Sequence, residues 1–230
     1  MYRTELYSEM ETFKGMKSKQ DIRRPVDLYK PYFKVKRYID VVGALVGLII
    51  LAPIFFMVAL LIKLDDPRGP VFFKQQRIGK GEIGFGMFKF RSMCVDAEEK
   101  LAALLEENEI EGAMFKMKDD PRITRIGKII RKTSIDELPQ LYNVLRGEMS
   151  LVGPRPPLPR EVEQYTDYDK QRLAITPGCT GLWQISGRNN VGFEEMVELD
   201  MQYIESISLK KDFEIIFKTF SVLFGDDNAY

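Results

Sequence analysis

Two adjacent carboxylates, Asp136 and Glu137, are the residues whose type and spacing most strongly suggest chemistry. They lie in "TSIDELPQLYNVLRGEMSLVGPRP", residues 133–156. A carboxylate can act as a covalent nucleophile, and Mg²⁺ is typically held by one or two protein carboxylates together with substrate phosphates. A structural role is the alternative, because Ser134-x-x-Glu137 matches a helix capping box.

Pro139 favours a helix that begins at Asp136. If Ser134 were the cap, Pro139 would lie fifth in the helix and would remove a backbone hydrogen bond. With Asp136 as the cap, Pro139 falls in the first turn, where nothing is lost. The positive end of such a helix would hold Asp136 as an anion. A helix start and a reactive site are therefore compatible.

The composition restricts how catalysis could proceed. The 230 residues include no histidine, which excludes Ser-His-Asp triads, histidine bases and histidine-ligated zinc. The two cysteines, Cys94 and Cys179, are too few for a thiolate metal site or a disulfide framework, and we expect both to be reduced. Lys+Arg and Asp+Glu balance at 34 each, so the net charge indicates no partner.

Two further segments could bind phosphate. Arg155 stands between Pro154 and Pro156, whose fixed φ restrains the backbone, and a guanidinium fork suits phosphate oxygens. An ordinary surface turn is the alternative. The glycine-rich loop "PGCTGLWQISGRNN", 177–190, contains Arg188 but matches neither a Walker loop nor a dinucleotide fingerprint. By itself it is a weak phosphate signal.

Residues 41–62 form an uncharged, apolar segment that could anchor the chain in a membrane. As one helix it would be roughly 33 Å long, enough to cross a bilayer. Pro53 divides it into two arms too short to cross alone, and basic residues flank both ends. These features favour a helix broken at Pro53 that enters and leaves through the cytosolic leaflet, over a spanning helix or a buried core helix.

Residues 71–91 predict a β-hairpin. On its second strand, period two puts Lys89 and Arg91 on the face opposite Phe88 and Phe90. This basic face is either half-exposed to solvent or turned toward an anionic ligand.

Helical patterns cover most of the remaining chain. We expect an acidic helix at 95–111 and a second helix at 193–205. The last segment carries an apolar stripe that predicts either a core-packed helix or one lying on a bilayer: Phe213, Ile216, Phe217, Phe220, Leu223 and Phe224.

Four stretches together resemble the bacterial sugar transferases, the monotopic phosphoglycosyl transferases that begin capsule and exopolysaccharide assembly. The stretches are "KRYIDVVGALVGLIILAPIF", "VFFKQQRIGKGEIGFGMFKFRSM", "DDPRITRIGKIIRKTSIDELPQLYNVLRGEMSLVGPRP" and "PGCTGLWQISGRN". The resemblance covers residues 34–224, and the chain is similar to the small, catalytic-domain-only form of the family.

The resemblance implies transfer of a sugar-1-phosphate from a UDP-sugar to undecaprenyl phosphate, with Mg²⁺ as cofactor and UMP released. The family's acidic dyad falls on Asp136 and Glu137, which would also hold the metal. Its phosphate-binding cations fall on Lys89, Arg155 and Arg188. A covalent phosphosugar on Asp136 is expected, with direct attack in a ternary complex as the alternative.

The implied fold class is α+β and helix-rich. We expect a polar arm (1–33), a re-entrant membrane helix (34–64) and a cytosolic catalytic domain (65–230) with a small hairpin and interfacial amphipathic helices. The implied location is the cytosolic face of the bacterial inner membrane, with the bilayer as a partner. We expect no nucleic-acid partner, and self-association into a homo-oligomer stays open. The alternative to an enzyme is a membrane-anchored scaffold that binds anionic lipid.

Overall fold

The structure, a computed structural model, describes residues 30–97, 99, 100, 117, 120–186 and 192–225. Its helices are α2 (Lys30–Asp65), α4 (Arg125–Lys132), α5 (Gln140–Arg146), α6 (Pro159–Val162), α7 (Asp167–Lys170), α8 (Leu182–Ser186), α9 (Phe193–Glu205) and α10 (Leu209–Gly225). Short 3₁₀ turns are η2 (Lys80–Glu82), η4 (Ile135–Glu137) and η5 (Gln171–Ala174). The strands are β1 (Phe72–Ile78), β2 (Gly84–Phe90), β3 (Ser150–Val152) and β4 (Gly178–Thr180). Nearly all of the predicted arm 1–33, most of the predicted helix 95–111, and Arg188 lie outside the described residues.

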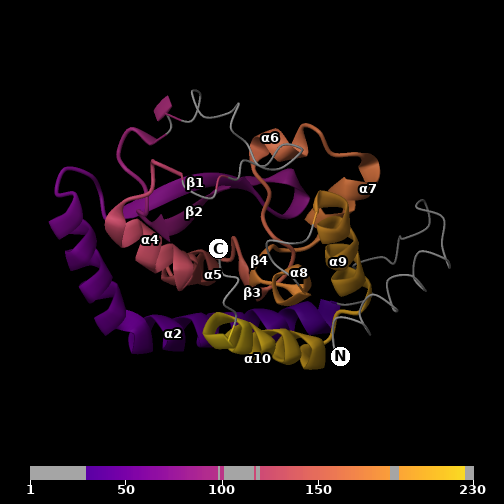
Figure 1. The fold of residues 1–230 in the computed structure, drawn as a ribbon. Coiled ribbons are helices and arrows are strands. Elements are labelled where there is room, and N and C mark those ends of the chain that lie inside the picture. Colours follow the sequence, from indigo (N-terminus) through magenta and orange to yellow (C-terminus); the bar gives the residue numbers. More distant parts are fainter. Residues whose placement is uncertain (1–29, 98, 101–116, 118–119, 187–191, 226–230) are drawn as a thin grey trace.

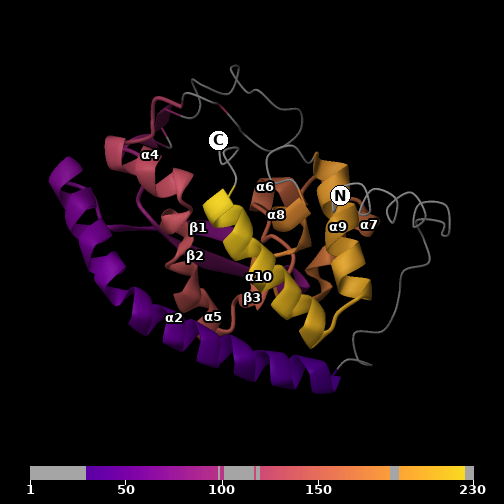
Figure 2. The same cartoon turned by 60° about the horizontal axis from the view of Figure 1, so that its bottom comes forward.

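The apolar segment forms one long helix, α2, which curves as it passes under the rest of the protein (Figures 1 and 2). We predicted an interruption at Pro53, but the chain stays helical through this residue. Proline lacks an N–H and displaces the carbonyl four residues before it, and a long helix can absorb this defect by bending. The helix also begins earlier than residue 34, within the predicted arm. Among the described residues, this is the helix long and apolar enough to cross a membrane.

One face of α2 packs on the protein along the length of the helix. Tyr32 and Lys36 near its start bond to Asp212 of α10. Ala44 in the middle is fully buried, and Val58 near the end is 2% exposed. The opposite face is apolar and exposed, and includes Val42, Leu45, Ile49, Ile50, Phe56, Leu60 and Leu64. The helix therefore has a docking side and a free apolar side.

The predicted hairpin is confirmed: β1 and β2 pair antiparallel, with Phe73 opposite Lys89 and Arg77 opposite Phe85. Asn143 of α5 fastens the second strand. Its side chain accepts from the Phe88 N–H at 2.9 Å and donates to the Gly86 carbonyl at 2.8 Å. Because these groups would otherwise be unpaired at a strand edge, Asn143 fixes α5 against the strand that carries Lys89.

A second, parallel pair of strands, β3 and β4, was not predicted. Each strand has three residues, too few to show an alternating pattern. The glycines of the loop "PGCTG" allow this pairing, because a Cβ on Gly178 would lie 2.1 Å from the Gly153 nitrogen and one on Gly181 2.3 Å from its oxygen. Close backbone approach thus explains these glycines without a phosphate.

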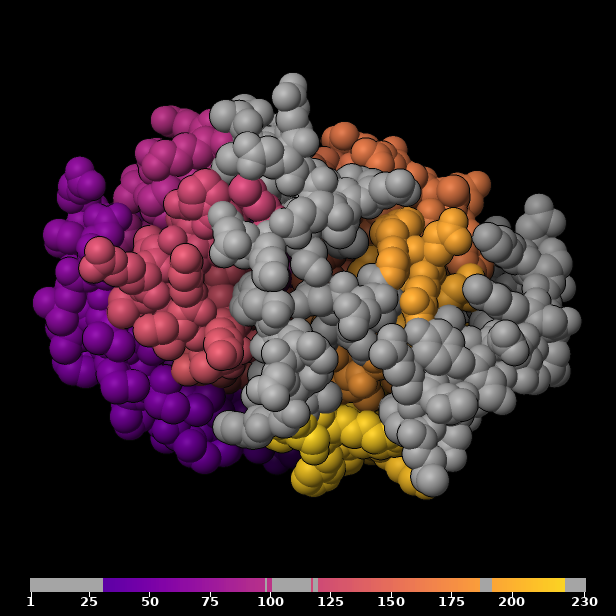
Figure 3. All heavy atoms as spheres, in the orientation of Figure 1, coloured from indigo at the N-terminus to yellow at the C-terminus, as the bar shows by residue number. Residues whose placement is uncertain are grey.

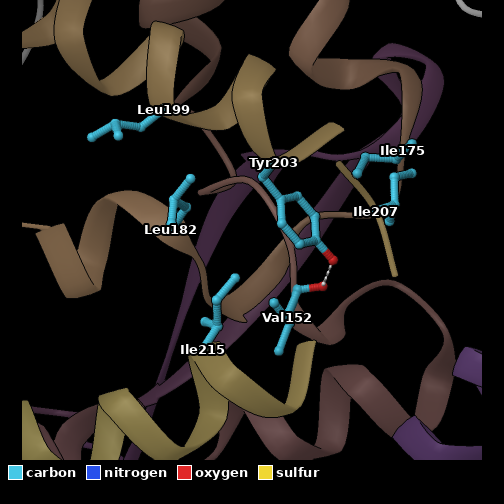
Figure 4. Packing of buried hydrophobic residues seen from close by; sticks show 7 residues of the cluster. All are labelled: Val152, Ile175, Leu182, Leu199, Tyr203, Ile207 and Ile215. Carbon is cyan, nitrogen blue, oxygen red and sulfur yellow. Dashed lines mark hydrogen bonds between the residues drawn. The ribbon is translucent and has the colours of Figure 1, made fainter. Parts of the chain in front are cut away.

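The largest of the core clusters packs around Val152 of β3 (Figure 4). It joins β3 to α8, α9 and α10 through Val152, Ile175, Leu182, Leu199, Tyr203, Ile207 and Ile215. The Tyr203 hydroxyl oxygen also lies 3.4 Å from the Val152 carbonyl oxygen. The segment that contains Arg155 therefore directly follows a strand that is firmly packed in the core.

Helix α10 has features of both predicted alternatives. Ile215 is fully buried in the core, whereas Phe213, Phe217 and Phe220 are 46–69% exposed. The start of α10 contacts the start of α2 through Asp212 and Lys36, and in the space-filling view α10 (yellow) lies at the bottom of the molecule while α2 (indigo) extends along the left side (Figure 3). The predicted helix at 193–205 is confirmed as α9.

Candidate active site

Asp136 and Glu137 lie in the 3₁₀ turn η4, between α4 and α5. The predicted helix start at Asp136 is wrong, because α5 begins at Gln140, after Pro139. The Leu138 N–H bonds to the Ile135 carbonyl, three residues back, and Pro139 has no N–H with which to extend the pattern. The 3₁₀ turn therefore ends before Pro139, and α5 begins after it.

Ser134 does not cap this turn with its side chain. It adopts a left-handed backbone with φ 54°, which is uncommon for a residue other than glycine and costs on the order of 1 kcal/mol. This conformation joins α4 to η4 directly ahead of the two acids. The strained backbone of Ser134 thus lies beside the two acids, and the need to position them would explain it.

Glu137 is paired with Lys89 of β2, with 2.7 Å between Oε1 and Nζ. The Glu137 side chain is 45% exposed and that of Lys89 is 20% exposed. Burial by itself would raise the pKa of Glu137, but the charge and hydrogen bond of Lys89 outweigh it and hold the pKa below its ordinary value. Glu137 is thus an anion at neutral pH.

Arg91, predicted on the same face as Lys89, does not join the site. Its guanidinium bonds to the Asp66 carboxylate at 2.9 Å and to the Asp66 carbonyl at 2.6 Å, where the chain leaves α2. The basic face therefore splits: Lys89 faces the dyad, and Arg91 holds the exit from the apolar helix.

Asp136 is 7% exposed, and burial raises its pKa to about 6. The charge of Lys89 lowers this pKa in part, and the neighbouring Glu137 raises it. We expected a helix start to stabilise the anion, but desolvation dominates and the shift has the opposite sign. At pH 7 the carboxylate is still about 90% ionised. A poorly solvated anion of this kind suits a nucleophile.

Arg155 lies in the segment after β3, with a half-buried side chain 3.5 Å from Glu161. Its charge helps to lower the pKa of Glu137 against the effect of burial, after the larger contributions of Lys89 and Arg77. The structure therefore brings Lys89 and Arg155 into the surroundings of the dyad. Arg188 lies outside the described residues.

Two cations near the dyad were missed by sequence reasoning. Arg77 of β1 lowers the pKa of Glu137, and Arg131 of α4 lowers that of Asp136. Burial and the charge of Arg155 lower the pKa of Arg77 itself to about 9. The register places Arg77 on the same face of the hairpin as Lys89, so period two applied to the first strand would have identified it.

The donor set of the dyad suits Mg²⁺ that is completed by a substrate. Two adjacent carboxylates supply hard oxygen ligands, and the Glu137 side chain is accessible. In the part of the chain that the structure describes, no group of three or more Asp, Glu, Cys or His residues could form a closed metal cage. Water and phosphate oxygens would supply the remaining ligands.

Fold and site together describe a domain with a long apolar helix and a carboxylate pair surrounded by cations. A family model described as "Bacterial sugar transferase" matches residues 31–226, and the chain belongs to this family.

Known relatives agree with this assignment. The galactosyl transferase CpsE of Streptococcus agalactiae is 49% identical over 216 residues, which cover 93% of this chain and 47% of that protein. The undecaprenyl-phosphate galactose phosphotransferase of Salmonella typhimurium is 45% identical over 200 residues, 85% of this chain and 42% of the relative. The exopolysaccharide production protein ExoY of Rhizobium meliloti is 44% identical over 188 residues, 80% of this chain and 83% of the relative. The chain spans about half the length of the first two relatives.

Proposed function

We propose that this chain transfers a sugar-1-phosphate from a UDP-sugar to undecaprenyl phosphate through a covalent intermediate on Asp136. The observation that carries the proposal is the buried, mostly ionised Asp136 beside Glu137, with Lys89, Arg77 and Arg155 around them. Relatives named as phosphotransferases acting on undecaprenyl phosphate support the choice of acceptor. Such an activity begins capsule or exopolysaccharide assembly, as the names of related proteins suggest.

The first step forms a bond between an Asp136 oxygen and the phosphorus that carries the sugar. The bond from that phosphorus to the bridging oxygen breaks, and its electron pair leaves with UMP. In the second step a phosphate oxygen of undecaprenyl phosphate attacks the same phosphorus and releases the Asp136 carboxylate. One hard displacement is thus divided into two.

The surrounding charges lower the cost of bringing two anions together. Lys89 and Arg155 neutralise the diphosphate, and the fork of Arg155 can hold two oxygens at once. Glu137 and Asp136 would hold Mg²⁺, which when bound offsets further negative charge on the phosphates. Arg188, from the glycine-rich loop, is proposed as a third cation on the substrate.

The packing of α2 supports a re-entrant topology on the cytosolic side of the bacterial inner membrane. Lys36 near its start pairs with Asp212, and Asp66 directly after its end pairs with Arg91, so both ends contact the same domain. A helix that crossed the bilayer would carry one end away from the domain. The exposed apolar face of α2 and the exposed phenylalanines of α10 would then face lipid.

A labelling experiment tests this topology. Single cysteines at Lys34 and Lys80, in a background without Cys94 and Cys179, should both be protected from an impermeant reagent in intact cells. Labelling of one site alone would show that the helix spans the bilayer.

A non-catalytic scaffold explains less of the molecule. Lipid binding would account for α2 and for the basic clusters, but not for an acidic residue that is buried at a cost of about 3 kcal/mol, the equivalent of its pKa shift. A desolvated carboxylate is retained more readily where it reacts.

The decisive experiment omits the lipid acceptor. Purified protein is incubated with Mg²⁺ and UDP-galactose, UDP-glucose or UDP-N-acetylgalactosamine, the sugars that the relatives' names suggest. We expect one donor to release UMP and to add the mass of a phosphosugar at Asp136. Steady turnover in the presence of acceptor without any adduct would indicate direct transfer instead.

A further inference from the structure

The segment that presents Arg155 is held in an unusual way. Residues 154–157 read Pro-Arg-Pro-Pro, so three of the four have no N–H with which to fix the backbone. Each of the four carbonyls instead accepts a hydrogen bond from outside the segment. The donors are the Gly178 N–H for Pro154 (2.9 Å), Arg172 Nη2 for Arg155 (3.2 Å), Arg77 Nη1 for Pro156 (3.0 Å) and the Ile78 N–H for Pro157 (2.9 Å).

The two side-chain donors are buried arginines from different elements. Arg77 of β1 is 6% exposed, and its Nε and Nη2 also donate to Gln75 Oε1, at 3.3 and 2.8 Å. One guanidinium therefore links the hairpin that carries Lys89 to the segment that carries Arg155.

Arg172 of η5 holds the neighbouring carbonyl from the other side. Its side chain and that of Asp200 in α9 are both 0% exposed and form an ion pair. The same guanidinium donates to the Tyr165 hydroxyl at 2.9 Å. Removing two charges from water is expensive, so a pair placed here needs a role that an apolar pair would not fill.

We propose that Arg77 and Arg172 are positioning residues that fix the backbone of residues 154–157 and thereby aim the Arg155 guanidinium at the diphosphate of the donor. The proposal rests on the function proposed above. It assigns neither arginine a contact with substrate. Both act through Arg155, because they bind the carbonyl of that residue and of the one after it.

Arginine is required here because of its geometry. A guanidinium is a planar fork whose donors can satisfy Gln75 and Pro156 at once, whereas a lysine ammonium is a single point with a flexible stem. Arg77→Lys keeps the positive charge near Glu137 but loses the rigid bridge. A displacement of about 1 Å at a phosphate-binding group can cost about 100-fold in rate.

The test is a double-mutant cycle. We expect Arg77→Lys to lower kcat about 10- to 100-fold with a smaller change in KM for the UDP-sugar. Combined with Arg155→Ala, it should cause almost no additional loss, because the group that it positions is gone. Arg172→Lys should show the same non-additivity. Additive losses in the double variants would overturn the proposal.

Arg91→Lys is the matched control. Arg91 is also 6% exposed and, like Arg77, binds a side-chain oxygen and a backbone carbonyl, but at the end of α2. Its substitution should lower the melting temperature, yet its effect on kcat should add to that of Arg155→Ala.

Hydrogen exchange separates this inference from the proposed function. Amide exchange in residues 150–162 should accelerate in Arg77→Lys and stay unchanged in Arg91→Lys, whether or not the protein turns over a UDP-sugar. If the wild-type protein shows no transfer but Arg77→Lys still exchanges faster than wild type, the proposed reaction is rejected and the positioning role is kept. Unchanged exchange in Arg77→Lys would reject the positioning role.

Discussion

Two lysine–carboxylate pairs occupy different regions of this protein, and they differ in how completely they are closed. Lys36–Asp212 joins α2 to α10 at 2.9 Å, with side chains 9% and 8% exposed. Lys89–Glu137 lies at the dyad at 2.7 Å, with side chains 20% and 45% exposed. The separations are similar, but the surroundings are not.

Asp212 is fully engaged by protein groups. Tyr32 and Lys36 both donate to its Oδ2, and Tyr203 donates to its Oδ1 at 2.7 Å. At the dyad, Lys89 donates to Glu137 Oε1 at 2.7 Å, and the Glu137 side chain still stays 45% exposed. A saturated buried pair holds elements together, whereas an open pair has capacity for a ligand. The first pair is therefore closed by protein groups, whereas the second leaves the Glu137 carboxylate accessible, as the proposed function requires.

The largest expected effect is on activity at the open site. Asp136→Asn should lower UMP release more than 1,000-fold and abolish the phosphosugar adduct, because an amide cannot attack phosphorus. UMP release and intact-protein mass measure both. The protein should still fold, since the change keeps the size of the side chain. Full turnover by this variant would remove Asp136 from the mechanism.

The next effect is on stability at the closed pair. Lys36→Met leaves Asp212 buried without its cation and should lower the free energy of unfolding by about 3–5 kcal/mol. The protein that remains folded should retain its activity within about threefold. Denaturant titration in detergent measures the first quantity, and kcat per folded molecule the second.

An exposed pair provides the control for this loss. Lys218 and Glu214 of α10 pair at 2.6 Å with side chains 31% and 39% exposed. Lys218→Met should therefore cost less than about 1 kcal/mol. A loss equal to that of Lys36→Met would mean that burial does not distinguish the pairs.

A pH series tests the electrostatic cost at Asp136. Its folded pKa of about 6 exceeds the ordinary value of 3.8, so the fold favours the protonated acid. The stability contributed by this acid is fully present below pH 3.8 and is lost as the pH rises through 6. In a chelator, Asp136→Asn should thus gain stability over wild type between about pH 4 and 7, by up to about 3 kcal/mol.

Melting temperatures of both proteins across this range give the measurement. A constant difference between the two proteins at all pH values would show that Asp136 is solvated and ordinary.

The last prediction concerns Lys89→Met, for which we expect the opposite pattern to Lys36→Met: a large loss of activity and a small loss of stability. Lys89→Met should lower UMP release roughly 100-fold, because a phosphate-facing cation is lost. Its effect on the free energy of unfolding should stay below about 1 kcal/mol, because the partner Glu137 is half exposed. A large loss of stability with normal turnover would assign Lys89 the structural role of Lys36.

Sequence patterns predicted the elements that depend on near neighbours. The uncharged run 41–62 required an apolar helix, period two identified the hairpin, and 3.6-residue spacing identified α9 and α10. The absence of histidine restricted the chemistry to carboxylates and cations. Chain proximity placed Asp136, Glu137 and Arg155 in one motif, because Arg155 is only 19 positions after Asp136.

Tertiary structure decided what depends on distant segments. The pKa of Asp136 rises because the residue is buried in η4, a turn that contacts both β2 and α4, and no local dipole argument could anticipate the sign of that shift. The parallel pairing of β3 with β4 and the four donors to residues 154–157 join segments from separate parts of the chain. Periodicity reports which face of an element is apolar, but burial, desolvation and hydrogen-bond partners exist only once those faces have met.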